Sequence, residues 1–424
     1  MKPLHLRTVA TGPYSSVNAS FPSSAPQQYS GYFQINRTYA AEMFFFYFSA
    51  RSAHRSKLPL VVWMTGGPGC SSELAVFYEN GPFKITEDLQ LRENDDPRDR
   101  VYDEKVVAAD MLDFMLAFYQ KFPEYAGREL YITGESYGGH YVPAVSAGIL
   151  AHNRKQNNAS PLINLEGFAI GNGLTDPLKQ YSLYADFSAS KGLIDEALRS
   201  SINTIFPVCG FLIRACNSLS WSPLCYFALL VCQQTVVGPI QLAAGNFNVY
   251  DVRKECIGPL CYDFSRLDDY LAQPSVREAL GVDDRSWQSC SPDVYQDMSS
   301  DIMKNYGGLV EPQLEAGMRV MIYAGVEDWI CNWLGNRKWL LEMAWSQQAE
   351  FVAAPERNWT VDGRVAGSVQ AHGPLSFVKV YGAGHMVPMD AGRSALAMLQ
   401  SFLRDEPLAP AARKPAPVAG VSVS

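Results

Sequence analysis

The sequence predicts an α/β fold, in which a mixed, mostly parallel, doubly wound sheet is interrupted by an insertion stapled by disulfides. Short apolar runs typical of buried strands alternate with segments of helical periodicity, and several of these runs end in glycine-rich loops. The alternation stops between residues 177 and 308, and six of the nine cysteines cluster inside that interval. A chain of 424 residues that is 47% hydrophobic is long enough to bury such a core.

The central motif is Gly-Glu-Ser-Tyr-Gly at residues 134–138, which stands between an apolar run and a helix-like segment at 142–151. A G-x-S-x-G sequence between a strand and a helix is typical of a nucleophile elbow. Its glycines permit the strained turn that exposes the serine hydroxyl. The helix N-terminus adds partial positive charge where an oxyanion would form. Ser136 is therefore the predicted nucleophile.

The elements before the motif follow in order. Residues 1–25 are rich in Ser, Pro and Thr, which predicts a flexible arm. The aromatic-rich runs 28–36 and 43–49 predict a β-hairpin. Residues 58–64 predict a buried strand that leads into Thr-Gly-Gly-Pro-Gly-Cys-Ser-Ser at 65–72. This loop lacks the Gly-Lys-Ser/Thr ending of a phosphate-binding loop, and we interpret it as the second half of an oxyanion hole.

Residues 91–105 break the pattern, because ten of these fifteen residues are charged. They predict a solvated loop where a doubly wound sheet would have another buried strand. Apolar residues at helical spacing then predict a helix at 106–122, and residues 163–170 predict a strand that ends in Gly-Asn-Gly. The predicted core therefore spans 26–176 and 309–404, and the cap is the insertion at 177–308.

Two strands after the insertion deliver polar residues on loops. The strand at 319–324 leads to Glu327 and Asp328, and the strand at 375–380 leads to a glycine-rich loop that ends in His385. A helix is predicted at 392–403, and the Pro, Ala and Val-rich residues 405–424 predict a disordered tail.

A serine nucleophile needs a base and an orienting acid, and in this fold type the chain order is Ser, acid, His. Of the six histidines, only His385 follows a strand on a glycine-rich loop. Asp328 fits best as the acid, with Glu327 as the runner-up and Asp176 after the preceding strand as a further candidate. The alternative for Asp328 is a purely structural helix N-cap.

Composition and cysteines narrow the class of protein. The 35 basic and 43 acidic residues give a net charge of −8. The sequence contains no basic run with interleaved aromatic residues, so we expect no nucleic-acid binding. The sequence contains no stretch of about 18 apolar residues, so we expect no membrane span. The spacing of the clustered cysteines fits no common zinc template, so disulfides are expected, with no metal and no cofactor. The candidate glycosylation sites are Asn18, Asn36, Asn158 and Asn358. We expect a secretory-pathway protein, although residues 1–16 lack the apolar core of a signal peptide.

Five motifs resemble the serine carboxypeptidase family of the α/β-hydrolase fold, and plant-like members in particular. They are Trp-Met-Thr-Gly-Gly-Pro-Gly-Cys-Ser-Ser (63–72), Glu-Asn-Gly-Pro (79–82), Gly-Glu-Ser-Tyr-Gly-Gly-His-Tyr (134–141), Ile-Cys-Asn-Trp-Leu-Gly-Asn (330–336) and Gly-His-Met-Val-Pro (384–388). By resemblance the triad is Ser136, Asp328 and His385. The oxyanion donors would be the backbone N–H groups of Gly67 and Tyr137.

By the same resemblance, the substrate's C-terminal carboxylate would be bound by Trp63, Thr65, Gly66, Glu79 and Glu135. Two neighbouring glutamates cannot both ionise cheaply, so one should hold a proton near neutral pH. A protonated carboxyl can donate to a substrate carboxylate, whereas an ionised one repels it. Acidic working conditions follow, which favours a vacuole or lysosome, with an extracellular location also open.

The family's disulfide pattern implies the pairs Cys70–Cys290, Cys209–Cys232, Cys216–Cys225 and Cys256–Cys261, with Cys331 as a free thiol. One departure stands out near residues 91–105. The family has a core strand and an active-site loop there, which this chain lacks. Either the sheet re-pairs around the gap, or the sequence is an incomplete or alternatively spliced form.

The leading hypothesis is a serine carboxypeptidase, a monomer or homodimer that releases C-terminal residues from peptides through an acyl-enzyme. A family acyltransferase is the second hypothesis, although such members typically carry Asp in place of Glu135. A non-catalytic carboxylate-binding or chaperone-like protein is the third, and only the missing strand supports it.

Overall fold

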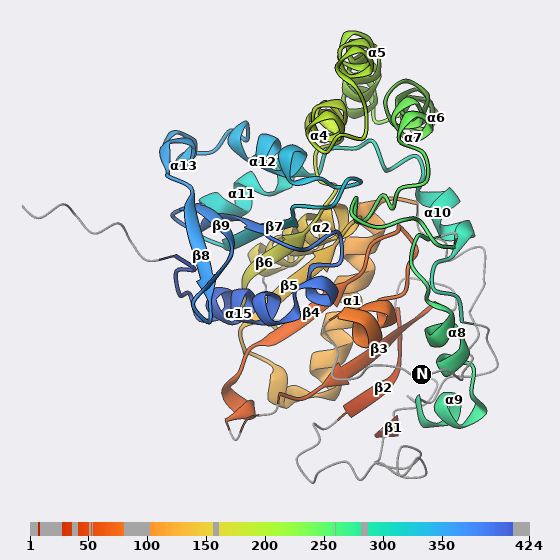
Figure 1. Cartoon of the computed structure of the whole chain (residues 1–424). Helices are drawn as coiled ribbons and strands as arrows, with labels where there is room; N and C mark the ends of the chain where they lie inside the picture. The colour runs from red at the N-terminus through yellow and green to blue at the C-terminus, as the bar shows by residue number, and fades with distance from the viewer. Residues whose placement is uncertain are drawn as a thin grey trace, which may run out of the picture.

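The central layer of the computed structural model is a seven-stranded sheet in the order β4-β5-β6-β7-β10-β9-β8 (Figure 1). The structure describes residues 7–8, 28–35, 41–50, 52, 54–79, 102–155, 161–258, 260–280 and 287–409. The strands of this sheet are β4 (Leu60–Met64), β5 (Leu130–Glu135), β6 (Leu165–Gly171), β7 (Arg319–Gly325), β8 (Arg357–Val361), β9 (Arg364–His372) and β10 (Leu375–Val380). Strands β4, β5, β6, β7 and β10 pair in parallel, and β9 and β8 add antiparallel strands. The mixed, mostly parallel sheet predicted from the sequence is confirmed.

Helices cover both faces of this sheet, which is why its inner strands are apolar throughout. Every residue of β5 is buried. On one face, α1 (Glu104–Lys121) and α2 (Gly138–Arg154) pack over the strands and bury Met115 and Val145. On the other face, α15 (Gly392–Leu403) buries Met398 and Phe402 against strand side chains. Because the central strands are parallel, their carboxyl ends meet at one edge, where the loops predicted to carry the chemistry emerge.

A separate small sheet is formed by β1 (Arg7–Thr8), β2 (Gln28–Gln34) and β3 (Glu42–Phe48). The predicted hairpin is therefore correct. The rings of Phe33 and Phe45 stack at 5.0 Å between centroids, and both rings lie near Phe114 and Phe118 of α1. Residues 7 and 8 pair with β2 within the segment predicted to be a flexible arm. The rest of that arm lies outside the described residues, as do residues 80–101 and the tail beyond 409.

Strand β4 forms one edge of the large sheet, because within the described residues it pairs with β5 alone. The described chain therefore does not re-pair around the position where the sequence analysis finds a strand missing. This edge matters for the site, since β4 leads directly into the loop at 65–72.

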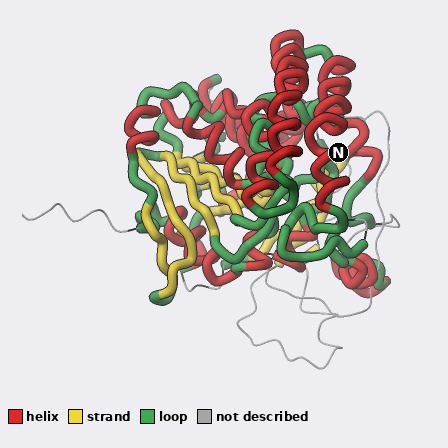
Figure 2. Tube along the Cα trace, turned by 45° about the horizontal axis from the view of Figure 1, so that its top comes forward, coloured by secondary structure: helices red, strands yellow, loops and turns green. Residues whose placement is uncertain are grey.

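The insertion lies between β6 and β7 and is helical, as its loss of strand–helix alternation predicts. Its helices are α3 (Pro177–Tyr181), α4 (Tyr184–Ser190), α5 (Glu196–Leu219), α6 (Ser222–Cys232), α7 (Gly238–Ala244), α8 (Ser265–Leu271), α9 (Pro274–Leu280) and α10 (Pro292–Met298). Helices α5 and α6 form a hairpin that projects above the strands (Figure 2). The disulfides Cys209–Cys232 and Cys216–Cys225 close this hairpin.

Two cap segments, Glu196–Leu219 and Ser222–Ala244, are long and apolar enough to cross a membrane by length and composition. In this structure they pack against each other and bury their cysteines in a cap cluster with Phe187, Ile240 and Trp329. The absence of a membrane span stays a prediction.

The remaining helices lie around the second half of the core. They are α11 (Glu311–Glu315), α12 (Trp333–Leu341), α13 (Gln348–Ala353) and α14 (Val387–Asp390). The antiparallel pair β8–β9 is not predicted by our sequence analysis. Its turn is Asp362-Gly363, with φ values of 50° and 76°, a sequence strongly preferred in tight hairpins.

Candidate active site

Ser136 sits in a sharp turn between β5 and α2, with a φ of 61° that non-glycine residues rarely adopt. The turn is held by its backbone: Ser136 N–H donates to the Gly171 carbonyl at 3.1 Å, and its carbonyl accepts from Leu174 N–H at 2.9 Å. A Cβ on Gly134 would lie 2.7 Å from the Met64 carbonyl oxygen, so only glycine fits between the adjacent strands here. Strain at a residue that neighbouring backbone fixes is typical of functional sites.

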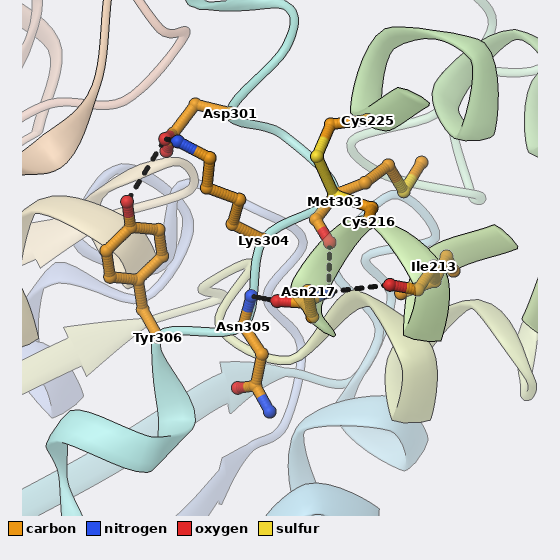
Figure 3. Close-up of a disulfide and its surroundings, with 9 residues drawn as sticks. All are labelled: Ile213, Cys216, Asn217, Cys225, Asp301, Met303, Lys304, Asn305 and Tyr306. Carbon is orange, nitrogen blue, oxygen red and sulfur yellow. Dashed lines mark hydrogen bonds and ion pairs between the residues drawn. A yellow bond between two sulfur atoms is a disulfide. The ribbon is translucent and has the colours of Figure 1, made fainter. Parts of the chain in front are cut away.

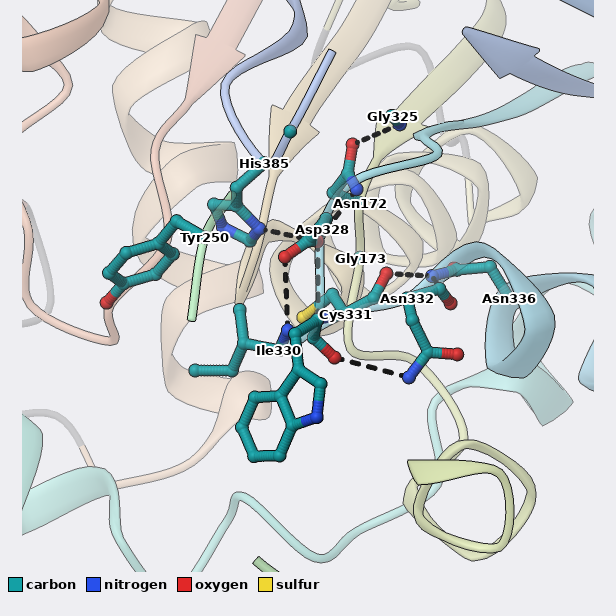
Figure 4. Close-up of polar contacts among 12 residues, drawn as sticks. Asn172, Gly173, Tyr250, Gly325, Asp328, Ile330, Cys331, Asn332, Asn336 and His385 are labelled. Atoms are coloured by element: carbon teal, nitrogen blue, oxygen red, sulfur yellow. Dashed lines mark hydrogen bonds and ion pairs between the residues drawn. The ribbon is translucent and has the colours of Figure 1, made fainter. Parts of the chain in front are cut away.

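Asp328 and His385 come together from the loops after β7 and β10. His385 Nδ1 lies 2.8 Å from Asp328 Oδ2, and both side chains are buried (Figure 4). Backbone N–H groups of Ile330 and Cys331 also donate to this carboxylate, at 3.1 and 3.2 Å. The carboxylate is thus held in one orientation, and it fixes the imidazole with Nε2 available for proton transfer.

Asn172, which the sequence analysis did not select, is a further donor to the acid. Its Nδ2 donates to Asp328 Oδ2 at 2.7 Å, while its Oδ1 accepts from Gly325 N–H at 3.0 Å (Figure 4). The side chain is fully buried and the residue has a φ of 41°. A polar residue between two glycines at the end of a buried strand was the signal that could have identified it.

Tyr250, from the cap, covers the other side of the histidine. Its ring centroid lies 5.1 Å from that of His385, and its carbonyl accepts from His385 N–H at 2.7 Å. The N–H of Tyr250 donates to Asn248 Oδ1 at 2.8 Å, which fixes the loop. Since this contact depends on how the cap folds over the core, no local pattern predicts it.

The loop at 65–72 lies directly against the elbow. A Cβ on Gly66 would meet Tyr137 N at 2.4 Å, so a side chain at this position would displace the elbow. The N–H groups of Gly67 and Tyr137 donate to no other group within the described part of the chain. Tyr137 also precedes the first turn of α2, where the helix dipole favours negative charge. Gly66 therefore packs against the elbow, and the assignment of the Gly67 and Tyr137 N–H groups as oxyanion donors stays a prediction.

The ring of Tyr137 extends away from this pocket to the base of the cap. Its hydroxyl donates to Asp301 Oδ2 at 2.9 Å, and Asp301 also binds Tyr306 and Lys304 (Figure 3). Beside them, Asn217 joins the hairpin to the same segment by donating to the Met303 carbonyl at 2.8 Å (Figure 3). The disulfide-closed hairpin is therefore linked to Tyr137 through one hydrogen-bonded segment.

Glu79 and Glu135 lie close together next to the loop that carries Thr65. Burial raises the pKa of Glu79 to about 7. Burial, and then the neighbouring Glu79, raise the pKa of Glu135 well above its usual range. Both oxygens of Glu79 and Oε2 of Glu135 are shielded from solvent without a hydrogen bond of normal geometry. Trp63 Nε1 donates to Thr65 Oγ1 at 3.0 Å, which orients the neighbouring hydroxyl.

The alternative triad residues have other roles in the structure. Glu327 forms an ion pair with Lys191 at 2.6 Å, and Asp176 caps the N-terminus of α3. His140 is buried in α2 with Nδ1 2.6 Å from the Leu174 carbonyl oxygen. None of these three side chains contacts His385 by a hydrogen bond among the described residues.

The structure joins the four cysteine pairs that the resemblance implies. Cys331 is unpaired and buried, and burial raises the pKa of its thiol well above the usual range. Asp328, Cys331 and His385 bring ligand atoms within 4.8 Å of one another, close enough by distance for a metal ion. Asp328 and His385 already bind each other, however, and a thiol with a raised pKa is a poor ligand because metals bind the thiolate. The donor set does not fit a metal.

A serine on a strand–helix elbow, followed in the chain by an acid and a histidine on later strand ends, defines a serine hydrolase of the α/β class. The sequence profile of the serine carboxypeptidase family matches residues 18–96 and 93–405. A serine carboxypeptidase-like protein of Oryza sativa subsp. japonica is 44% identical over 398 residues, which cover 88% of this chain and 92% of that protein. Serine carboxypeptidase 3 of Hordeum vulgare is also 44% identical, over 88% of this chain and 77% of its own length. The chain belongs to the serine carboxypeptidase family.

A solved structure supports the fold. The prohormone-processing carboxypeptidase from Saccharomyces cerevisiae superposes with a TM-score of 0.81 and 24% identity, and the match covers 92% of this chain and 93% of that one. The α/β-hydrolase fold implied by the sequence is therefore confirmed.

Proposed function

We propose that this serine carboxypeptidase removes C-terminal residues from peptides through an acyl-enzyme on Ser136. The observation that carries the proposal is the buried His385–Asp328 pair, delivered to the sheet edge where the strained elbow exposes Ser136. Asp328 holds the imidazole, and His385 acts as general base and then as general acid.

The reaction takes two steps. Ser136 Oγ attacks the scissile carbonyl carbon while His385 Nε2 takes the hydroxyl proton, and the N–H groups of Gly67 and Tyr137 bind the resulting oxyanion. The tetrahedral intermediate then collapses, and the C-terminal amino acid leaves with the proton from His385. Water then attacks the acyl-enzyme ester on Ser136 with the same help from His385, which releases the shortened peptide and restores the serine.

Restriction to C-terminal residues comes from the Glu79–Glu135 pair, together with Trp63, Thr65 and Gly66. A carboxyl that keeps its proton can donate to a substrate carboxylate. Since the pKa of Glu79 is raised to about 7, this donor is present in acid and is lost as pH rises through neutrality. The proposed working range is therefore acidic, as in a vacuole or lysosome.

Other properties belong to the same proposal. Four disulfides favour an oxidising compartment, either in the secretory pathway or outside the cell. The sequon residue Asn358 is exposed on strand β8, while Asn18, Asn36 and Asn158 lie outside the described residues. The partners are peptides with a free C-terminus, and the protein acts as a monomer or homodimer. Glu135 favours hydrolysis over acyl transfer.

The test compares KM against pH for one peptide with a free C-terminus and for its C-terminal amide. We expect KM of the free peptide to rise several-fold above pH 7, because ionised Glu79 repels the substrate carboxylate. The amide has no carboxylate to repel and should show no such rise. A common rise in KM for both substrates would contradict carboxylate recognition by the pair.

The control for the chemistry is Ser136→Ala, in which hydrolysis of both substrates should fall by several orders of magnitude while the protein stays folded. Near wild-type activity in this variant would show that the elbow is only a structural turn.

A further inference from the structure

The cap segment at residues 248–254 lies between the two loops that carry the acid and the base of the proposed triad. The first of these loops follows β7. The Val249 carbonyl accepts from the N–H groups of Trp329 and Ile330 at 3.2 and 3.0 Å. Since these two residues come directly after Asp328, the segment is hydrogen-bonded to the loop of the acid.

The same segment contacts the loop that follows β10 and carries the base. The Tyr250 carbonyl accepts from His385 N–H at 2.7 Å, and the two rings lie side by side (Figure 4). A Cβ on Gly384 would lie 2.4 Å from the Tyr250 carbonyl oxygen and 2.8 Å from Asp251 Cβ. No larger residue than glycine therefore fits between the segment and this loop.

Charged side chains extend from the segment to the helix that follows the base. Asp251 is fully buried, and its carboxylate binds the Arg253 guanidinium at 2.8 and 2.7 Å and Lys254 Nζ at 2.9 Å. Lys254 Nζ also donates to Asp390 Oδ1 at 3.1 Å, and Asp390 is the last residue of α14. Removal of one partner from a buried ion pair is costly, because the other charge is left without compensation.

The last contact reaches the loop of the base itself. Asp390 Oδ2 accepts from Gly384 N–H at 2.8 Å, and Gly384 directly precedes His385. Only 9% of the Asp390 side chain is exposed. A hydrogen bond from a backbone N–H to a carboxylate is stronger than one between neutral groups, so Asp390 fixes the backbone immediately before the imidazole.

We propose that Asp390 is a positioning residue for the base, and that the cap holds it in place through Lys254. In this arrangement the cap segment sets the spacing between the loops of Asp328 and His385. This role rests on the proposed function, because it takes His385 as the base. Asp390 acts through Gly384 and takes no part in proton transfer.

A second effect of Asp390 must be kept apart from positioning. Burial raises the pKa of Glu79, and the nearby charge of Asp390 adds to that rise. Loss of this charge would change the binding of a substrate carboxylate, which appears in KM of a free peptide near neutral pH. Positioning of the base appears instead in kcat, for substrates with and without a free carboxylate.

The experiment compares Asp390→Ala and Asp390→Asn with the wild type, on a peptide with a free C-terminus and on its C-terminal amide. Both substrates are measured at acidic pH, where Glu79 keeps its proton. Asp390→Ala removes the acceptor of Gly384 N–H and should lower kcat about 10- to 100-fold for both substrates, with KM little changed. Asp390→Asn keeps an oxygen that can accept this hydrogen bond, and should restore kcat to within about threefold of wild type.

Lys254→Met tests the link to the cap. Methionine keeps an apolar stem without the charge, and the hydrogen bond from Gly384 to Asp390 stays in place. We expect kcat to fall about three- to fivefold, and the same substitution should cost little more in the Asp390→Ala background, where its target is gone. The matched control is Lys179→Met, which breaks the ion pair of Lys179 on α3 with Glu342 and should leave kcat unchanged.

Three results would overturn the inference. A kcat within about twofold of wild type for Asp390→Ala would show that Gly384 needs no acceptor. An Asp390→Asn protein as slow as Asp390→Ala would show that the charge acts and not the position of the loop. Unchanged kcat in Lys254→Met would show that the cap does not act through Asp390.

Thermal unfolding checks that each variant is folded. If Asp390→Ala does not fold, Lys254→Met decides the outcome, because it leaves the hydrogen bond from Gly384 intact. A negative result for Asp390 would leave the proposed function standing, since that proposal is tested separately by Ser136→Ala.

Discussion

Asn172 donates a hydrogen bond to Asp328, the proposed acid of the triad, although it lies in none of the five family motifs. It bridges the Asp328 carboxylate and the Gly325 N–H, so it couples the ends of β6 and β7. No water is needed to explain the orientation of Asp328, because the protein supplies the donors. The residue positions the triad and makes no contact with substrate in our mechanism.

The first prediction is that Asn172→Gly lowers kcat about 10- to 100-fold with little change in KM. A hydrogen bond to a charged group contributes about 1.5–3 kcal/mol, and glycine accepts the φ of 41° without strain. Steady-state kinetics check this result. The control is Asn217→Ala, which removes a half-buried amide at the base of the cap and should lower the free energy of unfolding with little loss of kcat. A kcat within twofold of wild type for Asn172→Gly would contradict the positioning role.

Residues of this kind mark the limit of the sequence analysis. Ser136, Asp328 and His385 follow glycine-rich strand ends, and their order in the chain restricts the choice. Asn172 has the same local signal, but its role depends on β6 lying next to β7. The contact of Tyr250 with His385 depends on the fold of the cap. Both facts require the three-dimensional arrangement.

Glu104 is a buried carboxyl that the mechanism does not use. Both its oxygens lack hydrogen bonds, and burial, followed by the nearby carboxylates of Asp301 and Asp103, raises its pKa well above 4.5, while Lys304 opposes the shift. Above pH 4.5 the carboxyl of Glu104 loses its proton in the unfolded chain but keeps it in the folded protein. The free energy of unfolding of the wild type therefore falls as pH rises toward the raised pKa.

The second prediction is that Glu104→Gln removes this loss. The difference in Tm between the variant and the wild type should grow in favour of the variant as pH increases from 4.5 to 8, because glutamine does not ionise. Thermal unfolding at several pH values measures the difference. Parallel Tm curves for the two proteins across this range would show that Glu104 does not titrate with folding.

At the scale of elements, strands were predicted best where they end in a motif. Strands β4, β5 and β10 have apolar runs that lead into glycine-rich loops, β7 has an apolar run that ends at Gly325, and α15 has the predicted bounds of 392 and 403. The hairpin β8–β9 was missed although its Asp362-Gly363 turn is a hairpin signal, because its outer strand has only five residues, of which two are apolar. The disulfide pairs came from family resemblance, since spacing alone leaves many connectivities open.

The third prediction concerns two of these disulfides. Cys216–Cys225 closes a separation of 9 residues and Cys70–Cys290 one of 220. By loop-closure entropy their removal should cost roughly 2.6 and roughly 5 kcal/mol. We expect the Cys70→Ser/Cys290→Ser protein also to lose kcat, because Cys70 adjoins the oxyanion loop. Denaturant unfolding and kinetics of both double variants measure these effects, and the reverse order of stability would contradict the prediction.

At the scale of the whole molecule, the active site lies between two separate apolar clusters. One cluster joins the sheet to α1 and α2, and the other fills the cap. The cap cluster includes Tyr137 of the elbow and Trp329 beside the acid. Loss of cap packing would therefore disturb Tyr137, the proposed oxyanion donor, and the loop of Asp328, the proposed acid, even if the sheet stayed intact.

The final prediction is that mild reduction unfolds the cap before the core. Cys209, Cys216, Cys225 and Cys232 are fully buried and close the α5–α6 hairpin, whose outer face leaves Phe211 64% exposed. Without the bridges, this hairpin has too little buried apolar surface to stay folded. Amide hydrogen exchange at increasing concentrations of reductant should show that α5 and α6 lose protection while α1 and α2 remain protected. The value of kcat should fall together with the protection of α5 and α6. Simultaneous loss of protection in both clusters would mean that cap and core fold as one cooperative unit.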